Sequence, residues 1–557
     1  MGFKNLTVVF LCAAALGSGG CGFFEEEGGS EPAQCKDGKT RCDGDLMQQC
    51  EEGQWTYGDL CLHGCQSGKC NAAPAVCEVG ERRCYVNDVE RCEGPVGHWE
   101  VVEECGYTCE ESQCIDPPEQ VCVPQELFCN QNQLLQCNAN GSGWYVEQEC
   151  PVMCENGECV GQAEAHVRGT ISYEARLPEA SGEQIVLGLP KQLPLGFVLV
   201  LVSDGTQFIG QSISKADGSF EVGITRPLQG GESLLFVPVV MLGDEAILLV
   251  AKPSYGGDPM SGEPDPWVWN LPLEGNHDLG DLIIKEESGS GAAYIFAINR
   301  AAIASVIGTN LMPGEQHIAP LAILWAPGVG WSCGACFSGN QQQFGEQVIR
   351  NSIFIGGEPE GSSAWGYAVL LHEFGHYVAR NYSRDDSPGG SHTIGVPITP
   401  PFAWSEGWAT FFAVSTFSRF IGKAAPLYWD IQGGGSFWID LARLQFSSTF
   451  SVQAPDPSGG LTQHLDENWV AMMLWDLWDG ADVEEILEPD GTALGTQAVV
   501  EAVTSSRFLY GDRGAQGADF VDFLDAVLCA QPELDGSVVT TVTSYLGFPY
   551  DGAWTCN

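Results

Sequence analysis

Basic residues are scarce in this chain of 557 residues: Lys and Arg number 24 against 73 Asp and Glu, so the formal net charge is -49. Such a surface repels the phosphates of nucleic acid, which excludes nucleic acid as a partner. Long apolar runs are also missing beyond the N-terminus, and we expect no further segment of membrane-spanning length. Apolar residues still make up 44% of the chain, which is enough for several globular domains.

Residues 1–20 have the features of an export signal. Lys4 precedes an apolar stretch at residues 6–16 that is too short to cross a bilayer. The small residues before Cys21 resemble the lipobox of bacterial lipoproteins, although Ser18 stands where that motif usually has Leu. The resemblance implies that Cys21 is acylated and anchors the protein in the bacterial cell envelope; ordinary signal-peptidase cleavage is the alternative. Residues 21–34, rich in Gly and Glu, predict a flexible tether.

Cysteine spacing predicts three disulfide modules across residues 35–160. Once Cys12 leaves with the signal and Cys21 carries lipid, 22 of the 24 cysteines remain, and eighteen of them form three sets of six. In every set the first, second, fourth and fifth steps are 7, 8, 4 and 5 residues. Units of ~40 residues bury little core, so disulfides are expected to replace it, with the pairing left open. We expect a stalk or an adhesion module. The sets are Cys35, Cys42, Cys50, Cys61, Cys65 and Cys70; Cys77, Cys84, Cys92, Cys105, Cys109 and Cys114; and Cys122, Cys129, Cys137, Cys150, Cys154 and Cys159.

Residues 165–285 contain no cysteine and are rich in strand-forming residues, which predicts an all-β sandwich. Two runs, at 208–213 and 220–222, flank Asp217-Gly218, a pair typical of a tight hairpin turn. The region resembles carboxypeptidase-regulatory or transthyretin-like domains, which implies a structural spacer. The stretch EESGSG at 286–291 predicts a linker into a last, mostly α (α+β) domain at 292–557.

The segment 365–381 has helix-forming composition, with Ser362 or Ser363 placed to cap its start. It contains His372-Glu373-Phe374-Gly375-His376. Residues four apart lie on nearly the same helix face, so both imidazoles can reach one metal ion. Glu373 is rotated by about 100° from His372, beside the metal, where a carboxylate acts as general base rather than as ligand.

A catalytic zinc needs a third protein ligand. The metzincin extension requires Gly and His three and six residues after His376, but these positions hold Ala379 and Tyr382. Glu406 is the better candidate, because a lone carboxylate among Trp404, Trp408 and other aromatics is costly to bury without a cation. The sequence Ser-Glu-Gly-Trp-Ala around it resembles the Asn-Glu-Gly-Phe-Ala of gluzincin aminopeptidases.

The combined motif resembles gluzincin zinc metallopeptidases, the class that includes thermolysin, over residues 365–412. The resemblance implies a zinc ion held by His372, His376 and Glu406, with Glu373 as general base and a protein or peptide substrate. No aminopeptidase-type amine-binding motif is found, which favours an endopeptidase. Two departures stand out: 29 residues separate His376 from Glu406, and Thr410 replaces the Asp that orients a zinc-binding His in thermolysin-like enzymes. We therefore expect the groups that orient the histidines to come from elsewhere.

Several further residues are candidates for the site. The inserted loop at 383–392 is expected to form a rim over the cleft, with His392 binding substrate or orienting the site. His464, ahead of an apolar helix at 467–477, is the candidate for stabilising the oxyanion, a role that a histidine has in thermolysin. Cys333 and Cys336 are expected to form a small structural disulfide, and Cys529 and Cys556 to pair near the C-terminus. A surface adhesin with an inactive peptidase domain is the alternative function.

Overall fold

In the computed structural model the described residues run from 39 to 556, apart from 44–45, 52–53, 61–64, 67–68, 71–81, 86–87, 94–97, 105–107, 111–112, 116–121, 124, 131–132, 138–143, 182–183, 243–244, 254–263, 276, 308–310, 312–317, 340–341, 345–346, 358–361, 433–434, 444, 448–450, 480–493 and 555. The export signal, the tether and Cys21 lie outside them. The chain divides into two compact units, Met1–Asp116 and Pro117–Asn557.

Each cysteine module has the same strand plan, a three-stranded antiparallel sheet followed by a two-stranded hairpin. The strands of the first module are β1 (Thr40–Asp43), β2 (Leu46–Glu51), β3 (Gln54–Leu60), β4 (Cys65–Gln66) and β5 (Lys69–Cys70). Those of the second are β6 (Arg82–Tyr85), β7 (Asp88–Glu93), β8 (His98–Glu104), β9 (Thr108–Glu110) and β10 (Gln113–Ile115). Those of the third are β11 (Leu127–Asn130), β12 (Gln133–Cys137), β13 (Trp144–Glu149), β14 (Met153–Glu155) and β15 (Glu158–Val160).

In the third module the six cysteines pair first to third, second to fifth and fourth to sixth. The disulfides are Cys122–Cys137, Cys129–Cys154 and Cys150–Cys159. Cys150 and Cys154 are buried together with Leu134, so the bridges occupy the centre of the module. They therefore take the place of an apolar core, as expected for so short a unit.

Two four-stranded sheets follow. One has the order β19-β16-β22 with β28 also paired to β16, and the other has the order β21-β20-β23-β27. A short hairpin, β17–β18, extends from them. The bounds are β16 (Ala165–Ala175), β17 (Pro178–Ser181), β18 (Gln184–Leu187), β19 (Lys191–Pro194), β20 (Leu199–Ser203), β21 (Phe208–Ile213), β22 (Ser219–Ile224), β23 (Ser233–Val237), β27 (Trp269–Pro272) and β28 (Asp278–Ile284).

The predicted hairpin at Asp217-Gly218 is wrong. The turn is present, with Gly218 at a φ of 81°, but β21 and β22 belong to different sheets and do not pair with each other. The chain crosses between the sheets here, and a Cβ on Gly218 would lie 2.1 Å from the carbonyl oxygen of Ile171. Glycine is therefore required by this close approach as well as by its backbone conformation.

A third, six-stranded sheet has the order β24-β25-β29-β33-β30, with β26 paired to β25. Its centre is parallel, and β30 is an antiparallel strand beside β33. The strands are β24 (Val239–Leu242), β25 (Glu245–Lys252), β26 (Asp265–Pro266), β29 (Leu321–Leu324), β30 (Cys336–Ser338) and β33 (Asn351–Phe354). The sheet joins strands from both sides of the expected boundary at 285–292, so these two regions share one continuous core.

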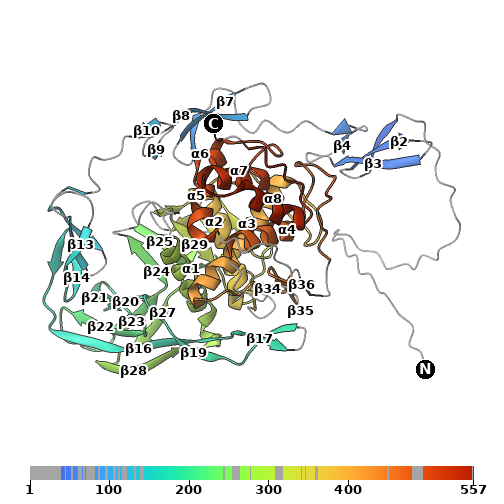
Figure 1. Ribbon diagram of the computed structural model, residues 1–557. Helices are drawn as coiled ribbons and strands as arrows, with labels where there is room; N and C mark the ends of the chain where they lie inside the picture. The colour runs from blue at the N-terminus through green and yellow to red at the C-terminus, as the bar shows by residue number, and fades with distance from the viewer. Residues whose placement is uncertain are drawn as a thin grey trace, which may run out of the picture. The chain divides into compact units, whose positions relative to one another are not determined.

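The helical region completes the second unit (Figure 1). Its helices are η1 (Glu286–Ser288), α1 (Ser290–Ile307), η3 (Ser362–Trp365), α2 (Tyr367–Tyr382), α3 (Pro400–Ile421), α4 (Glu467–Trp478), α5 (Gly495–Val503), α6 (Ser506–Tyr510), α7 (Phe520–Ala530) and α8 (Gly536–Tyr545). Small sheets lie between them: β31 (Gln342–Phe344) with β32 (Gln347–Ile349), and β34 (Leu427–Gln432), β35 (Gly435–Asp440) and β36 (Gln445–Phe446). The predicted disulfides Cys333–Cys336 and Cys529–Cys556 are both formed.

Two expectations for residues 286–307 are corrected. The predicted linker is ordered, because residues 286–288 form η1 and α1 begins at Ser290. By length and composition α1 is also apolar enough to cross a membrane, although no segment beyond the N-terminus was expected to be. In the structure 61% of this helix is buried, and it packs against β16 and β25 as a core helix.

Close approach of three helices positions the site. α2 packs along α3, and α3 along α4 (Figure 1). A Cβ on Gly375 of α2 would lie 2.9 Å from the Cα of Ala409, and one on Gly407 of α3 would lie 2.6 Å from the Cβ of Val470. The Trp408 indole N–H also donates a hydrogen bond to the Gly375 carbonyl oxygen at 3.2 Å. Gly375 precedes His376 and Gly407 follows Glu406. Larger side chains at the two glycines would push the helices apart and so separate these site residues.

Candidate metal centre

The two histidines and Glu406 converge from adjacent helices. His372 and His376 lie one turn apart on α2, and Glu406 lies on α3, which begins with Pro400 and Pro401 in its first turn. The predicted serine cap of α2 is wrong: Gly366 is the N-cap and makes no side-chain cap, while the serines lie in η3. The pairing of Gly375 with Ala409 keeps the two helices close enough for the three side chains to meet.

The three candidate ligand atoms are nearly equidistant. The Nε2 atoms of His372 and His376 lie 3.2 Å apart, and the Oε2 of Glu406 lies 3.2 Å and 3.3 Å from them. Atoms bound to a tetrahedral ion at about 2.0–2.1 Å are separated by roughly 3.4 Å. Two imidazole nitrogens and a carboxylate oxygen at this spacing form a group that could hold one metal ion.

The outer nitrogens of both histidines are engaged by hydroxyl groups. Thr410 Oγ1 lies 3.1 Å from His372 Nδ1, and Ser405 Oγ lies 3.3 Å from His376 Nδ1. An imidazole that donates from Nδ1 presents an unprotonated Nε2 to the centre of the cluster. The expectation that the orienting groups come from elsewhere than position 410 is therefore wrong for His372, because Thr410 itself supplies the oxygen.

The pKa values of Glu406, His372 and His376 depend both on burial and on the charges of their neighbours in the cluster. Burial opposes ionisation of Glu406, but His376 and His372 outweigh it and hold the pKa of Glu406 well below its ordinary value. Burial lowers the pKa of His372. Burial acts in the same direction on His376, yet Glu406 outweighs it and raises the pKa of His376 to about 9. The Glu406 carboxylate is therefore ionised and gives the cluster a negative charge.

Glu373 lies beside the cluster and is not among the three convergent ligand atoms. Glu373 is only 6% exposed, and the backbone N–H of Phe337 in β30 donates a hydrogen bond to the Glu373 carboxylate. Burial raises the pKa of Glu373 to about 7, with His376 acting in the opposite direction. A carboxylate with a pKa near neutrality can both accept and release a proton at neutral pH.

The inserted loop brings His392 to the cluster. Its Nε2 lies 3.0 Å from Glu467 Oε2 and 3.9 Å from Glu406 Oε2, and its ring contacts Phe402 edge-on. Burial would lower the pKa of His392, but the bond to Glu467 raises it to about 9. Glu467 itself is buried at the start of α4. We did not anticipate Glu467, because an acidic residue in the first turn of a helix is expected there for the helix dipole alone.

Two further residues concern the site: His464 was predicted to belong to it, and Tyr428 was not. His464 is exposed, and within the described part of the chain no contact joins it to the cluster. Tyr428 of β34 was not anticipated, although its ring centroid lies 5.8 Å from that of His372. Burial, with Asp430 and Glu373 nearby, raises the pKa of Tyr428 well above its ordinary value. No local signal marks a tyrosine in a short strand 22 residues beyond Glu406.

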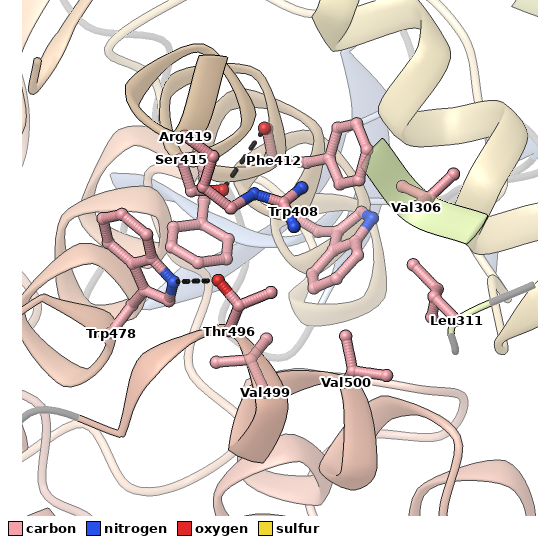
Figure 2. Close-up of a pocket in the computed structure, with 11 residues that line it drawn as sticks. Val306, Leu311, Trp408, Phe412, Ser415, Arg419, Trp478, Thr496, Val499 and Val500 are labelled. Atoms are coloured by element: carbon pink, nitrogen blue, oxygen red, sulfur yellow. Dashed lines mark hydrogen bonds between the residues drawn. The ribbon is translucent and has the colours of Figure 1, made fainter. Parts of the chain in front are cut away.

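A separate hollow lies on another face of α3 (Figure 2). It holds about 320 Å³ of empty space, part of it continuous with solvent, and is lined mainly by apolar side chains such as Trp408, Phe412 and Val500. Arg419 is the charged residue among the described residues that line it, and burial lowers the pKa of that guanidinium. Among the described residues that line the hollow there is no His, Cys or carboxylate, so these residues form part of the helix packing and not of the metal centre.

The chain matches no protein-family model, and its comparison with curated proteins gave no significant match. The assignment of the centre therefore depends on its geometry.

Proposed function

We propose that this protein is a zinc-dependent peptidase of gluzincin type, most simply an endopeptidase. The observation that carries the proposal is the convergence of His372, His376 and Glu406 with a buried Glu373 beside them. Two histidines and one carboxylate form the ligand set of several catalytic zinc sites, whereas structural zinc sites have four protein ligands. A purely structural ion would not require the additional carboxylate of Glu373.

Zinc suits this donor set, because borderline-soft zinc binds imidazole nitrogen together with carboxylate oxygen, while calcium and magnesium prefer oxygen alone. When bound, zinc would supply a Lewis acid that acidifies water and polarises a carbonyl group. His372 and His376 would hold the ion through Nε2, because Thr410 and Ser405 occupy their Nδ1 atoms. Glu406 supplies one negative charge.

Glu373 is proposed to move the proton. Held by the Phe337 backbone N–H, its carboxylate accepts a proton from the attacking water and delivers it to the leaving amine nitrogen. Its near-neutral pKa supports both halves of this transfer. His392, paired with Glu467, is proposed to contact the substrate, since it lies at the cluster while His464 does not.

The surrounding regions support a secreted enzyme. The disulfides favour an oxidising, extracytoplasmic location. We propose a lipid anchor at Cys21, which an intact-mass measurement of the mature N-terminus would test. The two four-stranded sheets are proposed to be a carboxypeptidase-regulatory or transthyretin-like sandwich, and the helical region a zincin fold; an experimental structure of the second unit that lacks either arrangement would reject that assignment.

Metal analysis of the purified full chain tests the centre. We expect close to one zinc per chain, removed by a chelator and restored by zinc, with His376→Ala losing most of it. The matched control is His277→Ala, because the described hydrogen bond of the His277 side chain is to the backbone oxygen of His166, in a region far from α2 in sequence. Stoichiometric zinc in His376→Ala would reject the ligand assignment.

A further inference from the structure

A carboxylate of the inserted loop lies behind one of the candidate metal ligands. Ser405 Oγ is 3.3 Å from His376 Nδ1 and 3.2 Å from Asp385 Oδ2. Asp385 also accepts a hydrogen bond from the Ser387 backbone N–H at 3.0 Å, so both of its oxygens are used. The three side chains therefore form a row that leads away from the cluster.

Hydrogen-bond chemistry gives this row a direction. A serine hydroxyl has one proton, and an ionised carboxylate only accepts. Ser405 must then donate to Asp385, which leaves its oxygen to accept from the N–H at Nδ1 of His376. In neutral His376 this arrangement places the proton on Nδ1 and leaves Nε2, the atom that faces His372 and Glu406, free to bind a metal ion.

Residues on either side of Asp385 are tied to the C-terminal helices. The Ser383 hydroxyl donates to the Val503 carbonyl oxygen at 2.7 Å, and the Arg384 guanidinium reaches the carbonyl oxygen of Gly511. Asp386 accepts a hydrogen bond from the Ala518 backbone N–H at 2.8 Å. These hydrogen bonds therefore hold the start of the loop in place between α2 and the segment from α5 to α7. The later residues of the loop are the ones that remain available for the predicted rim.

We propose that Asp385 is a positioning residue, which acts through Ser405 to orient His376 and so sets the metal affinity of the centre. The inference rests on the proposed metal-binding function. It accounts for the 29 residues between His376 and Glu406, because this additional chain brings the Asp385 carboxylate, which lies on neither α2 nor α3, to Ser405.

Zinc affinity, measured by competition with a chromophoric chelator, tests the proposal on the full chain. Asp385→Ala should weaken zinc binding by roughly 10-fold or more, which is the usual effect of losing a group that orients a ligand. Asp385→Asn keeps an acceptor oxygen and should lose less. The matched control is Asp456→Ala, because Asp456 accepts the same type of bond from the Ser458 backbone N–H in an exposed turn.

Double-mutant cycles separate positioning from a general loss of structure. If Asp385 acts through Ser405, Asp385→Ala should add little in a Ser405→Ala background, but should add its full effect to Thr410→Val, which acts on the other histidine. Unchanged zinc affinity in Asp385→Ala, or full additivity with Ser405→Ala, overturns the inference. Wild-type protein that binds no zinc instead rejects the proposed function itself, and the inference with it.

Discussion

Thr410 Oγ1 lies 3.1 Å from His372 Nδ1, one helical turn beyond Glu406 on α3. The same helix thus supplies both a candidate ligand and a hydroxyl group within hydrogen-bonding distance of another candidate ligand. Residues four apart share a helix face, so this arrangement follows directly from helical geometry once α2 and α3 are packed together.

The hydroxyl of Thr410 is expected to contribute to zinc affinity. Thr410→Val has nearly the same shape but cannot accept the His372 N–H, so zinc binding should weaken by about 10–100-fold. Thr410→Ser, which keeps the hydroxyl, should remain much closer to wild type. Chelator competition on both variants measures the difference, and equal affinities would show that the hydroxyl has no orienting role.

Gly375 is expected to be essential for helix packing. An added methyl group would press on Ala409, and overpacking of this kind costs about 1–3 kcal/mol. Gly375→Ala should lower the free energy of unfolding by that amount in urea. Gly356→Ala is the control, because the nearest atom to a Cβ there is 3.7 Å away. Similar stability of the two variants would contradict the packing described.

Disulfide mapping tests the modules. Cysteines of the terminal hairpins are directly opposed in all three: Cys65 with Cys70, Cys109 with Cys114, and Cys154 with Cys159. We therefore expect the first-to-third, second-to-fifth and fourth-to-sixth pairing of the third module to recur in the other two. Peptide mapping under non-reducing conditions should find Cys42 linked to Cys65 and Cys84 linked to Cys109. Any other partner for these cysteines would reject a common module.

Two buried carboxyl groups at α7 should make the free energy of unfolding decrease as the pH rises toward neutrality. Burial raises the pKa of Asp522 to about 7, and that of Asp519 to about 6, both above the ordinary value of 3.8. The folded state therefore binds these two protons more tightly than the unfolded chain does. The resulting stabilisation of the folded state is fully present below about pH 4 and is lost as the pH rises through about 7. Asp522→Asn cannot ionise, so unfolding measured between pH 4 and pH 8 should show a shallower decline. An unchanged slope would contradict this origin.

The local parts of the site were predictable from sequence. The spacing of His372 and His376 fixes their common helix face, and Glu406 stands out as a lone charge among aromatic residues. Glu467, Tyr428 and Asp385 were not anticipated, because each reaches the cluster through tertiary contacts that no spacing rule encodes. For the same reason the turn at Asp217-Gly218 was predicted, but the assignment of its flanking strands to two different sheets was not.

The most direct test of the peptidase proposal pairs zinc content with peptide cleavage for Glu373→Gln. Glutamine is nearly isosteric and Glu373 is not one of the proposed ligands, so the variant should keep its fold and its zinc. It cannot accept the proton, and cleavage of a peptide found by screening wild-type protein against a diverse library should fall by about 10²–10⁴-fold. Near-normal turnover by zinc-loaded Glu373→Gln would contradict the mechanism, and no cleavage of any peptide by zinc-loaded wild type would favour an adhesin with an inactive peptidase domain.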